Sequence, residues 1–98
     1  MLISPENKQK IITLLKNGWC KKTYSKNILG QSCYYWDAGA ISFCMMGAIN
    51  KVIFHEDSSE KIKFPIMDRI RELTSQNPIP FNDSCNSVEE VIKVVEQI

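Results

Sequence analysis

The longest apolar stretch of the chain, from Ala38 to Ile49, repeats at the spacing of a helix. One broad stripe occupies positions i, i+3, i+4, i+7, i+8 and i+11 and contains Ile41, Cys44, Met45, Ala48, Ile49 and Val52. The opposite side is hardly more polar, because Ser42 is the one hydroxyl residue between Asp37 and Asn50. We therefore predict a helix over 37–53, capped by Asp37 and covered on most sides as the core of the fold.

A second helix is predicted near the N-terminus. Ser4 can cap free amides, Pro5 stands where no donor is needed, and Glu6 suits the positive end of the helix dipole. Gly18 follows at the position where a left-handed residue commonly ends a helix. These signals predict a helix over 5–17.

Two more helices are predicted in the C-terminal half. An apolar stripe runs through Pro65, and because a proline disrupts a helix interior, we predict a regular helix over 65–76 only. A looser turn before it has candidate caps at Asp57 and Ser58. Ser87 and Glu90 have the spacing of a capping box, which predicts a last helix over 88–97.

Three segments are predicted to be extended. β-forming residues alternate weakly over 20–26, and two prolines restrict 79–82. Residues 32–35 fit either a returning strand or a lead-in to the central helix, and both remain open. The whole pattern predicts one mostly helical α+β domain over residues 1–98, with about four helices around a buried central helix and a small two- or three-stranded sheet or hairpin.

Composition agrees with a single folded domain. A chain of 98 residues is long enough for one core, and 44% hydrophobic with 23% charged residues is ordinary for a globular protein, which argues against disorder. The apolar stretch is shorter than the roughly 18 residues of a membrane span, so no membrane partner is expected. The N-terminus lacks the basic and apolar regions of a signal peptide, which favours a cytoplasmic location, and export by a route without such a peptide is left open.

Charge is distributed unevenly along the chain. Residues 1–36 hold six lysines against Glu6 alone, a net charge of +5, whereas residues 37–98 carry a net charge of −4. Such asymmetry is compatible with a basic face for nucleic acid. The isoelectric point of about 7.6 does not favour that function, because nucleic-acid-binding domains are typically above about 9.

The four cysteines and the single histidine raise the question of a zinc site. Successive cysteines are 13, 11 and 41 positions apart and form no C-x-x-C pair, and one of them lies on the predicted core helix. Structural zinc sites usually draw paired ligands from tight turns. We therefore expect no metal and no cofactor, and we interpret these residues as reduced, buried thiols outside any metal site: Cys20, Cys33, Cys44 and Cys85.

Cys20 is the candidate nucleophile if the protein is an enzyme. Lys21 and Lys22 would favour its thiolate, and Asn82 and Asp83 would supply polar groups that orient a base. The base itself is missing, because the only histidine, His55, lies in a polar loop. The alternative for Asn82 and Asp83 is a structural turn that locks the preceding prolines to the last helix.

Aromatic residues gather near the lysines between residues 19 and 36. Exposed tyrosine and tryptophan contribute contact area in binding surfaces. We predict that Trp19 and Trp36 instead cover the central helix, and we leave the three tyrosines open between the two roles. The candidate binding residues are Lys21, Lys22, Tyr24, Tyr34 and Tyr35.

The order of three short motifs resembles a small bacterial and phage domain family of unknown function. Here the motifs read Gly18-Trp19-Cys20, Cys44-Met45-Met46-Gly47-Ala48 and Phe81-Asn82-Asp83, followed by an amphipathic helix. In that family they read Trp-Cys, Cys-x-x-Gly-Ala and Trp-Asn-Asp, so Phe81 departs from the usual tryptophan. The likeness spans residues 10 to 97, and it implies a bacterial or phage origin without a mechanism.

Three functions follow from these patterns. The favoured one is a non-catalytic interaction or accessory module whose partner is another protein. The alternatives are a small enzyme that uses Cys20 and a nucleic-acid-binding protein that uses the basic N-terminal third. The sequence does not indicate an oligomeric state.

Overall fold

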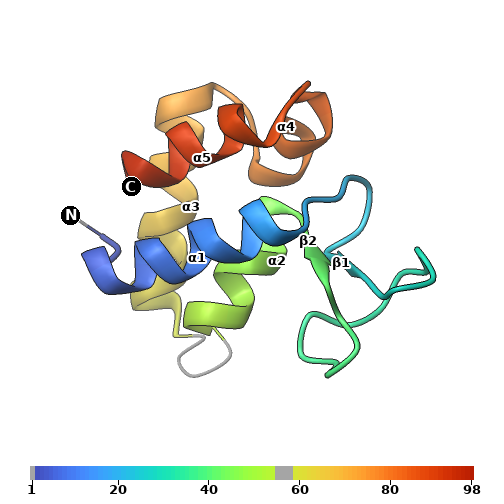
Figure 1. Cartoon of the computed structure of the whole chain (residues 1–98). Coiled ribbons are helices and arrows are strands. Elements are labelled where there is room, and N and C mark those ends of the chain that lie inside the picture. The colour runs from blue at the N-terminus through green and yellow to red at the C-terminus, as the bar shows by residue number, and fades with distance from the viewer. Residues whose placement is uncertain (1, 55–58) are drawn as a thin grey trace.

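Helices make up most of the fold in the computed structural model, which describes residues 2–54 and 59–98 (Figure 1). This confirms the mostly helical α+β class. The radius of gyration of 12.3 Å matches the value of about 13 Å for a compact domain of 100 residues. The elements are α1 (Pro5–Asn17), β1 (Ser25–Lys26), β2 (Ser42–Phe43), α2 (Met45–Ile49), the π-helical segment η1 (Asn50–Phe54), α3 (Glu60–Thr74), α4 (Pro78–Ser84) and α5 (Val88–Glu96).

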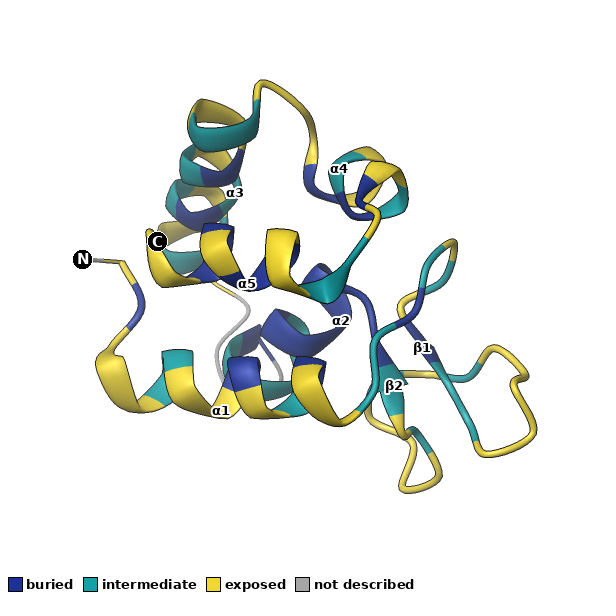
Figure 2. Ribbon diagram, turned by 45° about the horizontal axis from the view of Figure 1, so that its top comes forward, coloured by how far each residue is buried: buried dark blue, intermediate teal, exposed yellow. Residues whose placement is uncertain are grey.

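Helix α2 lies at the centre of the core, as predicted. All five of its residues are buried, and α1 and α4 pack against it (Figure 2). Its predicted start at Asp37 is wrong, because the helix begins at Met45. The preceding residues Ser42 and Phe43 pair instead with β1 in an antiparallel register, and Cys44 is extended with its thiol accepting the Gly47 N–H at 3.3 Å.

Helix α1 has the predicted bounds, but Gly18 ends it in an unexpected conformation. Its φ of −176° is extended and not left-handed, so that part of the prediction is wrong. The extended backbone lets the Gly18 carbonyl accept the Phe43 N–H at 2.9 Å. A Cβ at this position would overlap the carbonyl oxygen of Ile41, which explains why the position holds glycine.

Pro65 does not mark the start of a helix. Helix α3 begins at Glu60 and continues through Pro65 to Thr74, so the predicted range of 65–76 is wrong at both ends. The proline removes one amide donor, and the carbonyl left without it belongs to Lys61, an exposed residue that water can reach. Ser59 is the N-cap residue, and the candidate caps Asp57 and Ser58 lie outside the described residues.

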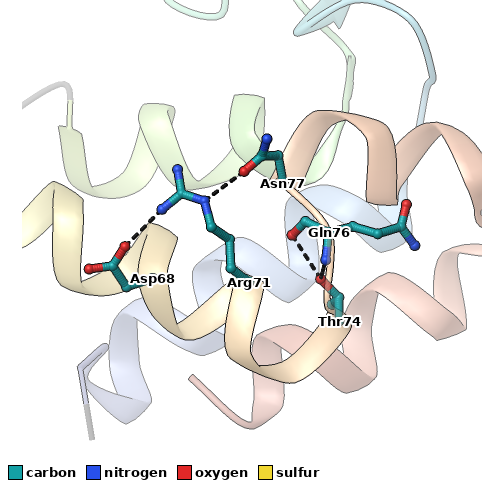
Figure 3. A network of polar contacts seen from close by, with 5 residues as sticks. All are labelled: Asp68, Arg71, Thr74, Gln76 and Asn77. Atoms are coloured by element: carbon teal, nitrogen blue, oxygen red, sulfur yellow. Dashed lines mark hydrogen bonds and ion pairs between the residues drawn. The ribbon is translucent and has the colours of Figure 1, made fainter.

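Residues 79–82 are helical and not extended as predicted. Pro78 and Pro80 occupy the first turn of α4, where backbone N–H groups have no helical partner, so the prolines initiate this helix. A polar network fixes the corner between α3 and α4 (Figure 3). Arg71 donates to Asn77 at 2.6 Å and to Asp68 at 2.8 Å.

The remaining predictions differ in outcome. The last helix is confirmed as α5, and its capping box forms, with the Ser87 N–H donating to Glu90 at 3.2 Å. The predicted strand 20–26 shortens to β1, because residues 21–24 bend. In the segment 32–35 only Ser32 pairs, through an isolated bridge to Lys26, and a turn follows.

Candidate interaction surface

Asn82 is buried and joins three segments of the chain. Its side-chain oxygen accepts the Trp19 indole N–H at 2.8 Å and the Met45 backbone N–H at 3.0 Å. Its amide nitrogen donates to the Cys20 carbonyl at 3.0 Å. These three hydrogen bonds hold the chain after α1 and the start of α2 against α4, so Asn82 has a structural role in the core.

Asp83 holds the neighbouring bend. Its carboxylate accepts the Lys22 backbone N–H at 2.8 Å, and Lys22 adopts a positive φ of 68°. The predicted structural alternative named the wrong segment, because Asn82 and Asp83 secure residues 19–22 and not the prolines. The two contacting segments are about sixty residues apart along the chain, so no local pattern in the sequence predicts this contact.

Cys20 lies where a nucleophile is disfavoured. The residue is 7% exposed, and its thiol faces the Thr23 carbonyl at 3.7 Å. Burial, followed by the charge of a neighbouring Cys44 thiolate, raises the pKa of Cys20 to about 11. The prediction that adjacent lysines favour its thiolate is wrong, because the lysine that lowers this pKa is Lys26, and the loss of hydration on burial outweighs its attraction. The only histidine of the chain, His55, lies outside the described residues.

We expect the Cys20 thiol of the native protein to resist alkylation. At pH 7 a pKa near 11 leaves a thiolate fraction about 300-fold lower than that of a free thiol of pKa about 8.5. Alkylation of the native protein by iodoacetamide, resolved by mass spectrometry, should modify the partly exposed Cys33 first. Fast modification of Cys20 with an apparent pKa below that of a free thiol would contradict the buried position.

Large exposed apolar side chains cluster in one part of the chain. Nine large apolar side chains are exposed among the described residues, and six of these nine lie between residues 24 and 41. We call these six the loop surface: Tyr24, Ile28, Leu29, Tyr34, Trp36 and Ile41. The loops around β1 and β2 project from the helical body at the end opposite the two termini (Figures 1 and 2).

Four aromatic rings line an open groove of about 740 Å³ within this surface. Tyr34 and Trp36 stack with ring centroids 4.4 Å apart and planes 6° from parallel, and Tyr35 meets Trp36 edge to face at 4.8 Å. Tyr24 also lines the groove. We call this hollow the aromatic groove. Trp36 is 53% exposed, so the prediction that it covers the central helix is wrong, whereas Trp19 does pack against the core.

A tight turn positions the stacked rings. The Asp37 N–H donates to the Tyr34 carbonyl at 3.0 Å, and the Asp37 carboxylate accepts the Gly39 N–H at 2.8 Å. These bonds hold Tyr34, Trp36 and Asp37 on one short loop. Asp37 therefore orients the groove and does not cap α2, because the helix begins eight residues later.

A second turn presents Ile28 and Leu29. The Asn27 side-chain oxygen accepts the backbone N–H groups of Leu29 at 2.9 Å and Gln31 at 3.1 Å. Ile28 and Leu29 are 83% and 76% exposed at its tip. A signal for this exposure is present in the sequence. Two aliphatic residues stand between a turn-forming Asn27 and Gly30, and the side chains at the tip of a short turn point away from the core.

The candidate lysines do not line the aromatic groove. The Lys21 ammonium lies 5.3 Å from the Trp19 ring, and Lys22 lines a separate pocket of about 210 Å³ beside Asn82 and Asp83. Asp37 is the charged residue of the groove among the part of the chain that is described. The structure thus brings Tyr24, Tyr34 and Tyr35 to one groove, and the two lysines lie outside its lining.

Comparison with known proteins adds no relative. No protein family, no curated protein and no solved structure matches the chain. The likeness to a bacterial and phage family therefore stays a prediction. None of the described helices combines the length and the apolar character needed to cross a bilayer.

Proposed function

We propose that the protein is a non-catalytic interaction module that binds another protein through the loop surface. The observation that supports this function is that six of the nine large exposed apolar side chains among the described residues lie within residues 24–41. Exposed apolar patches on a folded domain are typical of interaction sites, and three members of the loop surface, Tyr24, Tyr34 and Trp36, line one groove. Tyrosine and tryptophan are also the residues that dominate binding energy in protein interfaces.

The rigidity of the loops supports the same function. The tips of the Asn27 turn and the Asp37 turn are each fixed by backbone hydrogen bonds and by a side-chain oxygen that accepts backbone N–H groups, so little ordering remains to be done when a partner binds. An enzyme that uses Cys20 is less well supported, because that thiol is buried and its pKa is raised. Nucleic acid is also less well supported, because the carboxylate of Asp37 in the groove repels phosphate.

The test uses two variants with matched exposure. Trp36 in the groove and Phe64 on α3 are 53% and 52% exposed, so replacing either with serine removes a similar exposed ring. Tagged wild type, Trp36→Ser and Phe64→Ser are used to capture proteins from the cells that naturally make this chain. We expect at least one protein to be retained by wild type and Phe64→Ser and to fall about tenfold or more with Trp36→Ser, since an aromatic anchor often contributes 2 kcal/mol or more.

Circular dichroism of the variants checks that each remains folded. Equal capture by the two serine variants would contradict the proposed function, because the loop surface would then have no advantage over an ordinary exposed side chain on α3.

A further inference from the structure

The aromatic groove has a chemistry that narrows the class of its ligand. Its walls hold the rings of Tyr24, Tyr34, Tyr35 and Trp36, and its one charged side chain among the described residues is Asp37. Aromatic faces attract cations, and a neighbouring carboxylate adds direct Coulombic attraction. A groove of this composition favours a positively charged group over an anion or a purely aliphatic group.

Both the rings and the carboxylate are available to a ligand. Tyr34 and Trp36 are 67% and 53% exposed, and Asp37 is exposed as well. Among residues 2–54 and 59–98, no ion pair involves Asp37, and Lys21 and Lys22 do not line the groove. The Asp37 carboxylate accepts the Gly39 N–H, which fixes its direction without neutralising its charge.

The parallel ring pair distinguishes between the two cationic side chains of proteins. Tyr34 and Trp36 form a flat stack with a 6° angle between their planes. The guanidinium of arginine is planar, stacks on aromatic faces and can form two parallel hydrogen bonds to a carboxylate. The ammonium of lysine is compact and more strongly hydrated, so it gains less from such a stack.

We propose that the aromatic groove binds an arginine side chain of the partner protein. The guanidinium adds a third planar layer to the Tyr34–Trp36 stack and pairs with the Asp37 carboxylate. This proposal rests on the proposed function and specifies the partner chemistry at the same surface.

The test titrates the full chain with a blocked peptide, acetyl-Gly-Ser-Arg-Ser-Gly-amide, and follows backbone and indole N–H shifts by NMR. Matched peptides carry citrulline, lysine or norleucine at the centre. We expect the arginine peptide to shift the Trp36 indole N–H and the amides of 34–37, and to bind at least threefold more tightly than the other three. Citrulline is the sharpest control, because it keeps the shape of arginine without its charge.

Variants of the protein separate the contribution of the Asp37 carboxylate from that of the Trp36 ring. Asp37→Asn keeps an oxygen for the Gly39 N–H, so the turn remains, and it should weaken the arginine peptide about three- to fivefold without affecting citrulline. Trp36→Ala should remove binding of every peptide, and Phe64→Ala should change nothing. Citrulline, lysine or norleucine binding as tight as arginine, or an Asp37→Asn variant with unchanged affinity, would overturn the proposal.

A third titration distinguishes arginine binding from nucleic-acid binding at the same groove. A ten-residue oligothymidine should leave the Trp36 indole signal unshifted, and binding that falls steeply with salt would assign the groove to nucleic acid instead. One outcome is that the arginine peptide shows no preference in the titration while Trp36→Ser still loses a captured protein that Phe64→Ser retains. In that case the proposed interaction module stands, and only its specificity for arginine is wrong.

Discussion

Replacing Gly47 with alanine is expected to destabilise the protein by about 3 kcal/mol, although alanine is the better helix former by about 1 kcal/mol. Gly47 lies in the buried helix α2, and a Cβ there would overlap the carbonyl oxygen of Tyr24. That carbonyl is held in place by the Cys44 N–H at 3.0 Å, so the backbone has little room to withdraw. For a domain of this size the loss lowers the melting temperature by about 15 °C.

Gly39→Ala is the control for this prediction. Gly39 is exposed, and a Cβ there meets only the Asp37 carboxylate oxygen at 3.3 Å, so we expect a change within about 0.5 kcal/mol. Urea unfolding followed by circular dichroism measures both variants. Gly47→Ala with the stability of wild type would mean that the Tyr24 segment does not lie against α2.

Replacing Asn82 with alanine is expected to cost about 3 kcal/mol or more. The substitution leaves the Trp19 indole N–H, the Met45 N–H and the Cys20 carbonyl without their partner at a site that is 1% exposed. Each polar group left buried without a hydrogen bond costs roughly 1 to 3 kcal/mol, and partial entry of water reduces the sum. Thermal and urea unfolding measure the effect.

Two further substitutions make the Asn82 prediction specific. Asn77→Ala removes an exposed asparagine that accepts one bond from Arg71, and we expect a loss below about 1 kcal/mol. Asn82→Asp keeps the acceptor oxygen but turns a second oxygen toward the Cys20 carbonyl. Burial raises the pKa of the introduced carboxyl, so stability should be regained as the pH falls toward about 4, where the protonated acid can donate again. Equal losses for Asn77→Ala and Asn82→Ala would contradict the central role of Asn82.

Local signals in the sequence were sufficient for the two ends of the fold. Ser4 and Pro5 start α1, Ser87 and Glu90 start α5, and the apolar stripes of both helices face the core. These features depend only on residues within a few positions of each other. For that reason the predicted and observed bounds agree to within one residue.

Features that depend on distant contacts were predicted less well. The segment before α2 has helical periodicity, but the pairing of Ser42 and Phe43 with β1 outweighs the local preference, and the helix starts at Met45. The two prolines predicted an extended segment over 79–82, although both occupy the first turn of α4. The sequence indicated that tyrosines gather near residues 24–35, but the exposure of Trp36 depends on the turn that Asp37 holds.

The loop surface and the core are connected through Tyr24. Its side chain lines the aromatic groove, while its carbonyl accepts the Cys44 N–H and lies against Gly47 in α2. The rigid core thus fixes the backbone on which the exposed rings are displayed. Destabilising substitutions such as Gly47→Ala are therefore expected to impair binding indirectly, and Trp36→Ser is the variant that removes binding while the fold remains.

The most direct test of the interaction module is therefore the paired capture with Trp36→Ser and Phe64→Ser. The loop surface predicts a protein that wild type and Phe64→Ser retain and Trp36→Ser loses, with both variants folded. Identical captured proteins for both variants would show that residues 24–41 do not form the binding surface.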